Sequence, residues 1–174
     1  NPDIKVIYGV EAYLAPDKEP SVTNPKGQKL DTTYCVLDLE TTGFSPRTEK
    51  ITEIGIMKVK DGEVIDKFSC FVNPEKPIPQ RVVEVTNITD DMVKDAETID
   101  KVFPKMLEFI KGTVLVAHNA KFDIGFLKYV AKELGYEIVF LLSAVLRLTP
   151  YPQMSLLVQA TFLSGSCFNL QYNL

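Results

Sequence analysis

The stretch YCVLDLETTG, residues 34–43, places two carboxylates at the end of an apolar run. Its β-branched and aliphatic residues predict a buried strand over residues 34–40. Side chains two positions apart on a strand share a face and lie about 6.6 Å apart, so Asp38 and Glu40 point the same way. Partly buried acids repel each other and lose hydration unless a cation compensates their charge. The pair therefore predicts either a cation site or a solvated strand end.

A third acid, Asp123, follows the predicted strand TVLVAHN at residues 113–119. It falls in the first turn of a predicted amphipathic helix, AKFDIGFLKYVAKELG, for which Asn119 is the expected N-cap. A helix that starts beside the first strand would aim Asp123 at the same place as Asp38 and Glu40. Carboxylates are hard oxygen ligands suited to Mg²⁺ or Mn²⁺, two of which lie about 3.5 to 4 Å apart in two-metal phosphoryl-transfer sites. A lone acid at a helix N-terminus is also simply favourable with the helix dipole.

The remainder of the central region predicts a mixed α/β fold. The segment ITEIGIMKVKDGEVIDKFSCFVNP predicts two strands joined by a hairpin turn at Asp61 and Gly62. A proline-rich connection follows, then an expected N-cap at Thr89 and an amphipathic helix that stops at Gly112. The order strand, hairpin, helix, strand and helix favours a mixed sheet with packed helices.

Several other residues have simple structural explanations. His118, the only histidine, lies where a predicted strand meets a helix and fits a structural role better than that of a base. Cys35, Cys70 and Cys167 are an odd number without Cys-x-x-Cys spacing, so they predict core residues in a reducing, cytoplasmic setting. Gly43 is explained as a turn former.

The composition describes one globular domain with additional segments at both ends. The 174 residues are 45% hydrophobic, with a net charge of -4 and a pI near 5.1. No basic stripe is therefore expected to hold nucleic acid through phosphate neutralisation alone. Residues 1–30 contain a short apolar run and a proline-rich linker, so the main domain is expected to begin at residue 31. The chain begins with Asn1 and shows no basic-then-apolar leader, which predicts a piece of a longer protein without an export signal.

The C-terminal segment, residues 139–174, differs abruptly in composition. It contains one charged residue, Arg147, whereas 24% of the whole chain is charged. Its apolar runs are far shorter than the roughly 18 residues of a membrane span, so no membrane contact is expected. A buried strand and helix, an altered reading frame or an artificial terminus would each explain the segment.

Five sequence blocks follow one another over residues 34 to about 135: VLDLETTGFSP, ITEIGIMKV, FVNPEKPIP, VTNITDDMV and VLVAHNAKFDIGFL. Together they resemble the DEDD superfamily of 3′ to 5′ exonucleases, which has an RNase H-like fold. The details are most similar to the proofreading exonuclease domain of PolC-type bacterial DNA polymerase III. The resemblance implies an α/β fold with an RNase H-like mixed sheet flanked by helices, and an exonuclease domain over residues 31–138.

The resemblance also implies a two-metal site with two Mg²⁺ or Mn²⁺ ions. Its catalytic and metal-binding residues would be Asp38, Glu40 and Asp123. In the family mechanism one ion activates water and the other stabilises the leaving 3′ oxygen. The terminal nucleotide would lie near six further residues, namely Thr41, Thr42, Gly43, Ile88, Asn119 and Phe122. The implied partners are a single-stranded or frayed DNA 3′ end, the remainder of the polymerase chain and the replisome.

The N-terminal segment IKVIYGVEAYLAP is similar to the part of a PHP domain that precedes the inserted exonuclease in this family. Glu11 matches a metal-ligand glutamate of that domain. The resemblance thus implies that residues 1–30 are a PHP fragment plus linker, and this segment favours a DNA substrate over RNA.

The chain departs from the family after residue 138. The family needs a fourth carboxylate and, in this subtype, a histidine five residues before it as general base. Here no acid follows Glu137 and no histidine follows His118. General base catalysis alone contributes roughly 10² to 10⁴-fold, so we expect Mn²⁺ binding through Asp38 and Glu40 with slow primer hydrolysis. A catalytically silent nucleic-acid-binding module and an RNA-directed exonuclease are the open alternatives.

Overall fold

The computed structural model describes residues 22–23, 31–137 and 145–147. The expectations for Glu11, for Cys167 and for most of residues 1–30 and 139–174 lie outside the described residues. In chain order the elements are β1 (Val22–Thr23), β2 (Tyr34–Thr41), β3 (Ile51–Lys60), β4 (Glu63–Phe71), α1 (Gln80–Thr86), α2 (Asp90–Val93), α3 (Ile99–Ile110), β5 (Val114–Ala117), α4 (Ala120–Leu134) and β6 (Val145–Arg147).

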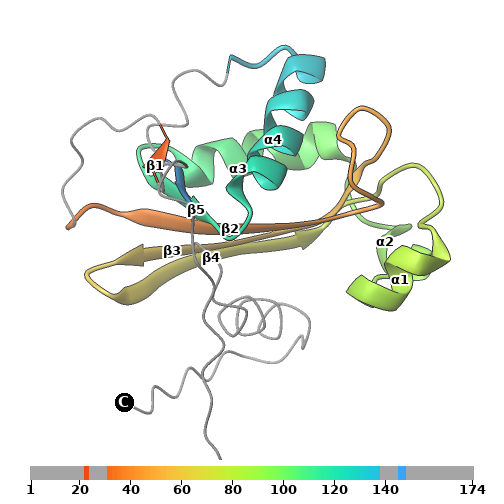
Figure 1. Ribbon diagram of the computed structural model, residues 1–174, viewed down its shortest axis with the longest axis horizontal. Coiled ribbons are helices and arrows are strands. Elements are labelled where there is room, and N and C mark those ends of the chain that lie inside the picture. Colours follow the sequence, from red (N-terminus) through yellow and green to blue (C-terminus); the bar gives the residue numbers. More distant parts are fainter. Residues whose placement is uncertain (1–21, 24–30, 138–144, 148–174) are drawn as a thin grey trace, which may run out of the picture.

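A mixed six-stranded sheet forms the centre of the molecule, in the order β1-β6-β5-β2-β3-β4 (Figure 1). Strand β2 lies inside it, parallel to β5 on one side and antiparallel to β3 on the other. The predicted mixed α/β architecture is confirmed. Strands β1 and β6 come from the segments before residue 31 and after residue 138, and they pair with each other at one edge of the same sheet. The domain boundaries at these two positions stay predictions.

Strand β2 separates an apolar face from an acidic one. Its burial alternates strictly, with Cys35, Leu37 and Leu39 buried and the residues between them only partly buried. Helices α3 and α4 lie together on one face of the sheet (Figure 1). Their buried side chains form one core with that face of β2, and the largest of these are Phe103, Met106, Phe126 and Leu127. Asp38 and Glu40 therefore point away from this core.

The turn between β3 and β4 confirms the predicted hairpin. Asp61 and Gly62 have φ angles of 52° and 83°. Positive φ at both central residues is the signature of a type I′ turn, whose twist matches that of the two strands.

We expect Gly62→Ala to lower the free energy of unfolding by about 1 kcal/mol, because L-residues with a Cβ disfavour positive φ. An added Cβ at Gly62 would meet nothing within 4 Å, so only the backbone conformation is tested. The matched control is Gly125→Ala inside α4, where an added Cβ also meets nothing. Helix propensity should make this control stabilising by up to about 1 kcal/mol. Urea unfolding would measure both, and a shift of the same sign in the two variants would contradict the explanation.

The helices end at the predicted glycines, whereas the predicted N-cap residues do not form capping hydrogen bonds through their side chains. Gly112 (φ 73°) follows α3 and Gly135 (φ 75°) caps α4 in the left-handed conformation. Thr89 and Asn119 occupy the N-cap positions of α2 and α4, but neither side chain makes a capping hydrogen bond. Among the described helices, none is long and apolar enough to cross a membrane.

Helix α1 was not anticipated from the sequence. Its residues QRVVEVT are rich in valine, which has a low helix propensity, and they follow a proline-rich segment. Val82 and Val83 pack against a second small hydrophobic cluster formed by Ile78, Ile88 and Val93. This packing stabilises a helix that its local sequence does not favour.

Candidate functional site

The three predicted acids come from two neighbouring elements. Asp38 and Glu40 lie on one face of β2, and Asp123 lies in the first turn of α4. The Asp123 side chain is 3% exposed, and its Oδ1 accepts a hydrogen bond from the Leu39 backbone N–H at 3.2 Å. This bond joins α4 to β2 between the two strand acids. The structure therefore places the Asp123 carboxylate against β2, next to the position between the two strand acids.

Burial raises the pKa of all three acids, and repulsion from neighbouring carboxylates raises it further for Glu40 and Asp123. Burial raises the pKa of Asp38, and only the nearby His118 opposes it. The pKa of Glu40 rises to about 7, first through burial and then through repulsion from Asp38, Glu53 and Asp123. The pKa of Asp123 also rises to about 7, through burial and then Asp38, although backbone hydrogen bonds lower it. The site thus has an excess of negative charge that a cation would relieve.

Glu53 is a fourth acid at this site, and the sequence reasoning missed it. It pairs directly with Glu40 across the antiparallel β2–β3 ladder. Burial and then the charge of Asp38 raise its pKa. The alternation of side chains along β3 could have predicted which face of the sheet Glu53 lies on. It could not have predicted that Glu53 pairs with Glu40 on β2. This pair is the last one of a continuous register that begins at Tyr34 and Val59, and the register shifts directly after it, between Glu40 and Thr41.

The donor set suits a hard divalent cation, although its side chains are not yet gathered around one point. Among the residues that the structure describes, no group of three or more His, Cys, Asp or Glu side chains is placed to hold a metal ion. Asp38, Glu40 and Asp123 thus do not form a preformed ion site. Their oxygen donors, burial and mutual repulsion are nevertheless the chemistry that Mg²⁺ and Mn²⁺ satisfy. Asp38, Glu40 and Asp123 therefore remain the predicted ligands.

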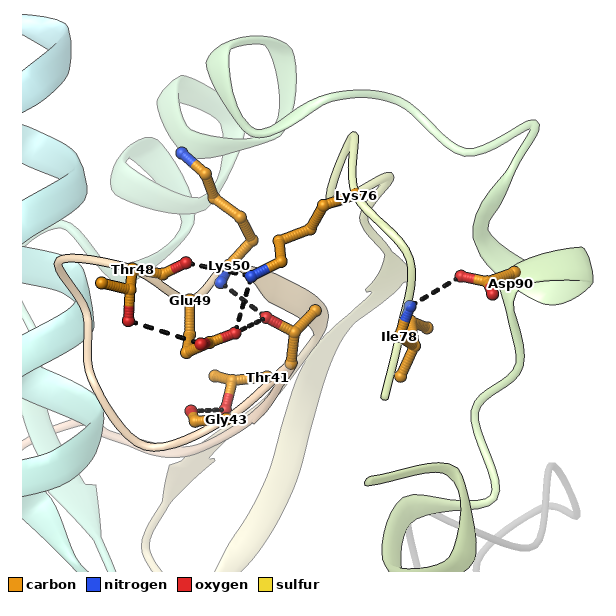
Figure 2. Close-up of polar contacts among 9 residues, drawn as sticks. Thr41, Gly43, Thr48, Glu49, Lys50, Lys76, Ile78 and Asp90 are labelled. Carbon is orange, nitrogen blue, oxygen red and sulfur yellow. Dashed lines mark hydrogen bonds and ion pairs between the residues drawn. The ribbon is translucent and has the colours of Figure 1, made fainter. Parts of the chain in front are cut away.

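The turn after β2 contains three residues predicted to lie near a nucleotide, and its hydroxyl groups are engaged within the chain. Thr41 Oγ1 donates to the Gly43 carbonyl at 2.7 Å, and the fully buried Thr42 donates to Glu49 Oε2 at 2.6 Å (Figure 2). Gly43 does not have a positive φ, so a left-handed turn is not what requires glycine here. A Cβ at Gly43 would lie 3.0 Å from Glu49 Cγ. Gly43 lies in a bend of the chain, and the close approach of Glu49 leaves little room for a side chain there.

Two further predicted contact residues lie in contrasting environments. Ile88 is 2% exposed and belongs to the cluster with Ile78 and Val93, so its side chain stabilises the α1–α2 region. Asn119 is exposed at the start of α4, next to the first turn that contains Asp123. The contact of either residue with a nucleotide stays a prediction.

An aromatic side chain that the sequence reasoning missed lies beside the predicted residue Phe122. Phe44, directly after Gly43, is 89% exposed, and its ring meets that of Phe122 edge-to-face at 6.5 Å. Phe122 in turn packs on Phe126 of the core. The position of Phe44 directly after the predicted turn was the sequence signal that could have identified it. An exposed aromatic ring supported in this way can stack on a base.

Comparison with known sequences identifies related proteins. A family model described as Exonuclease matches residues 35–154. DNA polymerase III PolC-type of Clostridium perfringens (strain 13 / Type A) is 52% identical over 133 residues, which are 76% of this chain and 9% of the relative. The protein of the same name from Bacillus subtilis (strain 168) is 46% identical over 132 residues, 75% of this chain and 9% of the relative. The chain thus spans about a tenth of the length of these curated relatives.

Solved structures show the same fold at low sequence identity. Exonuclease I (apo) superposes with a TM-score of 0.58 at 15% identity, covering 63% of this chain and 26% of that one. E. coli Exonuclease I in complex with a dA16 oligonucleotide gives a TM-score of 0.57 at 16% identity, covering 61% and 25%. The expected RNase H-like arrangement of a mixed sheet and flanking helices is confirmed.

Proposed function

The chain belongs to the exonuclease family, and we propose that it is the proofreading exonuclease domain of a PolC-type replicative DNA polymerase. It would remove mispaired nucleotides from DNA 3′ ends. The observation that supports this most strongly is that the Asp123 carboxylate is hydrogen-bonded to β2 between Asp38 and Glu40, and that the charges of Asp38 and Asp123 act on Glu40, all within the segment that matches the family. The identity of 52% to a PolC-type polymerase supports the replicative setting.

In this proposal the three acids hold two divalent ions, Mg²⁺ or Mn²⁺. When bound, such ions supply an activated water and neutralise the leaving oxygen of a phosphodiester. The Leu39 backbone N–H holds the Asp123 carboxylate at β2, where its charge acts on Glu40 and the charge of Asp38 acts on it. Glu53 adds negative charge behind Glu40 and would strengthen the attraction for cations.

The proposed partners follow from the charge of the chain and from its relatives. A net charge of -4 gives little attraction for DNA phosphates, so the remainder of the polymerase and the replisome would supply most of the grip on DNA. The proposed location is the cytoplasm, where bacterial replication takes place.

A second candidate function is a nucleic-acid-binding module without hydrolysis. The sequence favours it in one respect, since no acid follows Glu137 and no histidine follows His118. Binding without cleavage would still use the turn after β2 and the carboxylate site.

A primer-shortening assay distinguishes these functions. The chain is incubated with Mn²⁺ and a 5′-labelled DNA primer that ends in a mispair, and with the matched paired primer and an RNA primer of equal sequence. Proofreading predicts slow shortening by single nucleotides, faster at the mispaired DNA end, with release of nucleoside monophosphates. Faster shortening of RNA would support the RNA-directed alternative. Binding without any shortening would support the silent module.

Phe44→Ala is expected to weaken binding of single-stranded DNA by about 1–3 kcal/mol, the usual contribution of one base stacked on an aromatic ring. Fluorescence anisotropy with an oligonucleotide whose last linkage is a phosphorothioate, chosen to slow hydrolysis, would measure it. Stability should stay within about 0.5 kcal/mol, because the ring is exposed. Val85→Ala removes another exposed apolar side chain, on α1, and is the control. Equal DNA affinity of Phe44→Ala and the parent chain would contradict the stacking role.

A further inference from the structure

Thr42 closes the loop that follows the acidic strand. Its backbone N–H donates to the Lys50 carbonyl at 2.8 Å, and its Oγ1 accepts from the Lys50 N–H at 3.0 Å. The same hydroxyl donates to Glu49 Oε2 at 2.6 Å. Both ends of the loop 42–50 are thus held through one fully buried threonine.

Glu49 connects this loop to a second segment of the chain. Lys76 lies in the connection between β4 and α1, and its Nζ donates to Glu49 Oε2 at 2.9 Å and to the Thr48 carbonyl at 3.0 Å (Figure 2). The side chains of Lys76 and Glu49 are 33% and 21% exposed. Those of the surface pair Lys111–Glu108 are 68% and 76% exposed. The Glu49–Lys76 pair is thus more shielded from water and has additional hydrogen bonds, so it should contribute more than a surface pair.

Glu49 also lies against the turn itself. A Cβ at Gly43 would be 3.0 Å from Glu49 Cγ and 3.1 Å from Cδ, so the carboxylate side chain packs on the Gly43 backbone. Glu49 therefore contacts both Thr42 and Gly43, two of the residues predicted to lie near the terminal nucleotide. A shift of Glu49 would release both at once.

The segment that contains Lys76 is fixed at its other end. The Ile78 N–H donates to Asp90 Oδ1 at 2.9 Å (Figure 2), and the Ile78 side chain is buried against Ile88 and Val93. Lys76 is therefore held between the turn after β2 and the α1–α2 region. Hydrogen bonds thus connect Thr42 to Glu49 and Glu49 to Lys76, and Ile78, two residues after Lys76, is bonded to Asp90.

We propose that Glu49 and Lys76 are positioning residues, whose ion pair holds the turn Thr41–Gly43 in the conformation that binds the 3′-terminal nucleotide. The proposal rests on the proposed function. A turn released from this ion pair would sample other conformations, and the apparent dissociation constant rises as the binding-competent fraction falls. We expect loss of either partner to weaken binding of a DNA 3′ end about tenfold, the effect of ordering one or two extra side chains.

The test uses the full chain and an oligonucleotide whose last linkage is a phosphorothioate, with Mn²⁺ present. Lys76→Met and Glu49→Gln should each raise the dissociation constant about tenfold, and the double variant should be no worse than either single one. Lys76→Arg keeps the charge and should retain most of the affinity. Lys111→Met removes the exposed pair on α3 and is the matched control, with no expected change.

Amide hydrogen exchange of Thr42 gives a second, substrate-free readout. Its N–H is bonded to the Lys50 carbonyl, so Lys76→Met and Glu49→Gln should speed its exchange, whereas Lys111→Met should not. Weaker DNA binding with unchanged Thr42 exchange would overturn positioning in favour of direct contact between Lys76 and phosphate. Unchanged affinity of both variants, with a parent chain that binds DNA, would overturn only this inference. A parent chain that binds no DNA 3′ end would overturn the proposed function and the inference with it.

Discussion

Asp38→Asn is expected to abolish the stabilisation of the chain by Mn²⁺. A ligand at 100 times its dissociation constant adds about 2.7 kcal/mol to the free energy of unfolding, and this gain requires the charged carboxylate. Asp38 lies at the centre of the acidic site, where its charge raises the pKa of Glu40, Glu53 and Asp123. Replacing it by a neutral amide of the same shape removes one of the proposed ligands and lowers the attraction of the neighbouring acids for cations. Isothermal titration calorimetry and thermal unfolding with and without Mn²⁺ would measure the loss.

In the same variant the rate of 3′ hydrolysis should fall by at least about 100-fold. Replacing a residue that only supports a metal ligand already lowers activity by up to about 100-fold. Asp61→Asn is the matched control, because it makes the same chemical change in the exposed hairpin turn. Asn is as well suited as Asp to the positive φ of that turn. Equal Mn²⁺ uptake by Asp38→Asn and the parent chain would refute the metal site. Rapid primer hydrolysis by the parent chain, lost in Asp38→Asn, would instead refute the expected slow rate.

Phe126→Ala is expected to lower the free energy of unfolding by about 3–5 kcal/mol, the usual cost of removing a buried phenyl ring. Phe126 is 1% exposed in the core between α4 and the sheet, and its ring meets that of Phe122 at 5.0 Å. Since globular domains are stable by only about 5–15 kcal/mol, this loss would leave a chain that is partly unfolded near 37 °C. Chemical denaturation monitored by circular dichroism would give the magnitude.

Phe126→Ala leaves a cavity under α4, the helix that also contains Asp123. The variant should therefore also weaken Mn²⁺ binding indirectly. Val85→Ala, on the surface of α1, should change stability by less than about 0.5 kcal/mol and is the control. A loss for Phe126→Ala as small as that of the control would mean that α4 is not packed on the sheet as described.

Several features of the site followed from local sequence patterns. The two-residue period of YCVLDLET placed Asp38 and Glu40 on one face of β2, and the observed burial alternates in the same way. The Asp61-Gly62 turn followed from the residues that tolerate positive φ. Gly112 and Gly135 ended their helices for the same reason. These features depend on residues that are neighbours in the chain.

Helix α1 and the environment of Ile88 show where local patterns were insufficient. The valine-rich segment of α1 has weak helix propensity, and it is helical because Val82 and Val83 pack against a cluster from neighbouring elements. Ile88 was singled out through a family resemblance, whereas the structure buries it in that cluster. Burial of this kind depends on how elements pack and not on the period of the sequence.

By itself, the sequence determined that a central strand ends in two acids on one face and that a helix beginning near Asn119 places a third acid in its first turn. Only the tertiary structure decided that Asp123 reaches the Leu39 N–H, 84 residues away in the chain, and that Glu53 faces Glu40. It also decided that Glu49 and Lys76 meet beside the turn. The physical reason is that periods of 2 and 3.6 residues fix only the direction of a side chain along its own element. Strand register and the packing of α4 on the sheet fix which side chains meet.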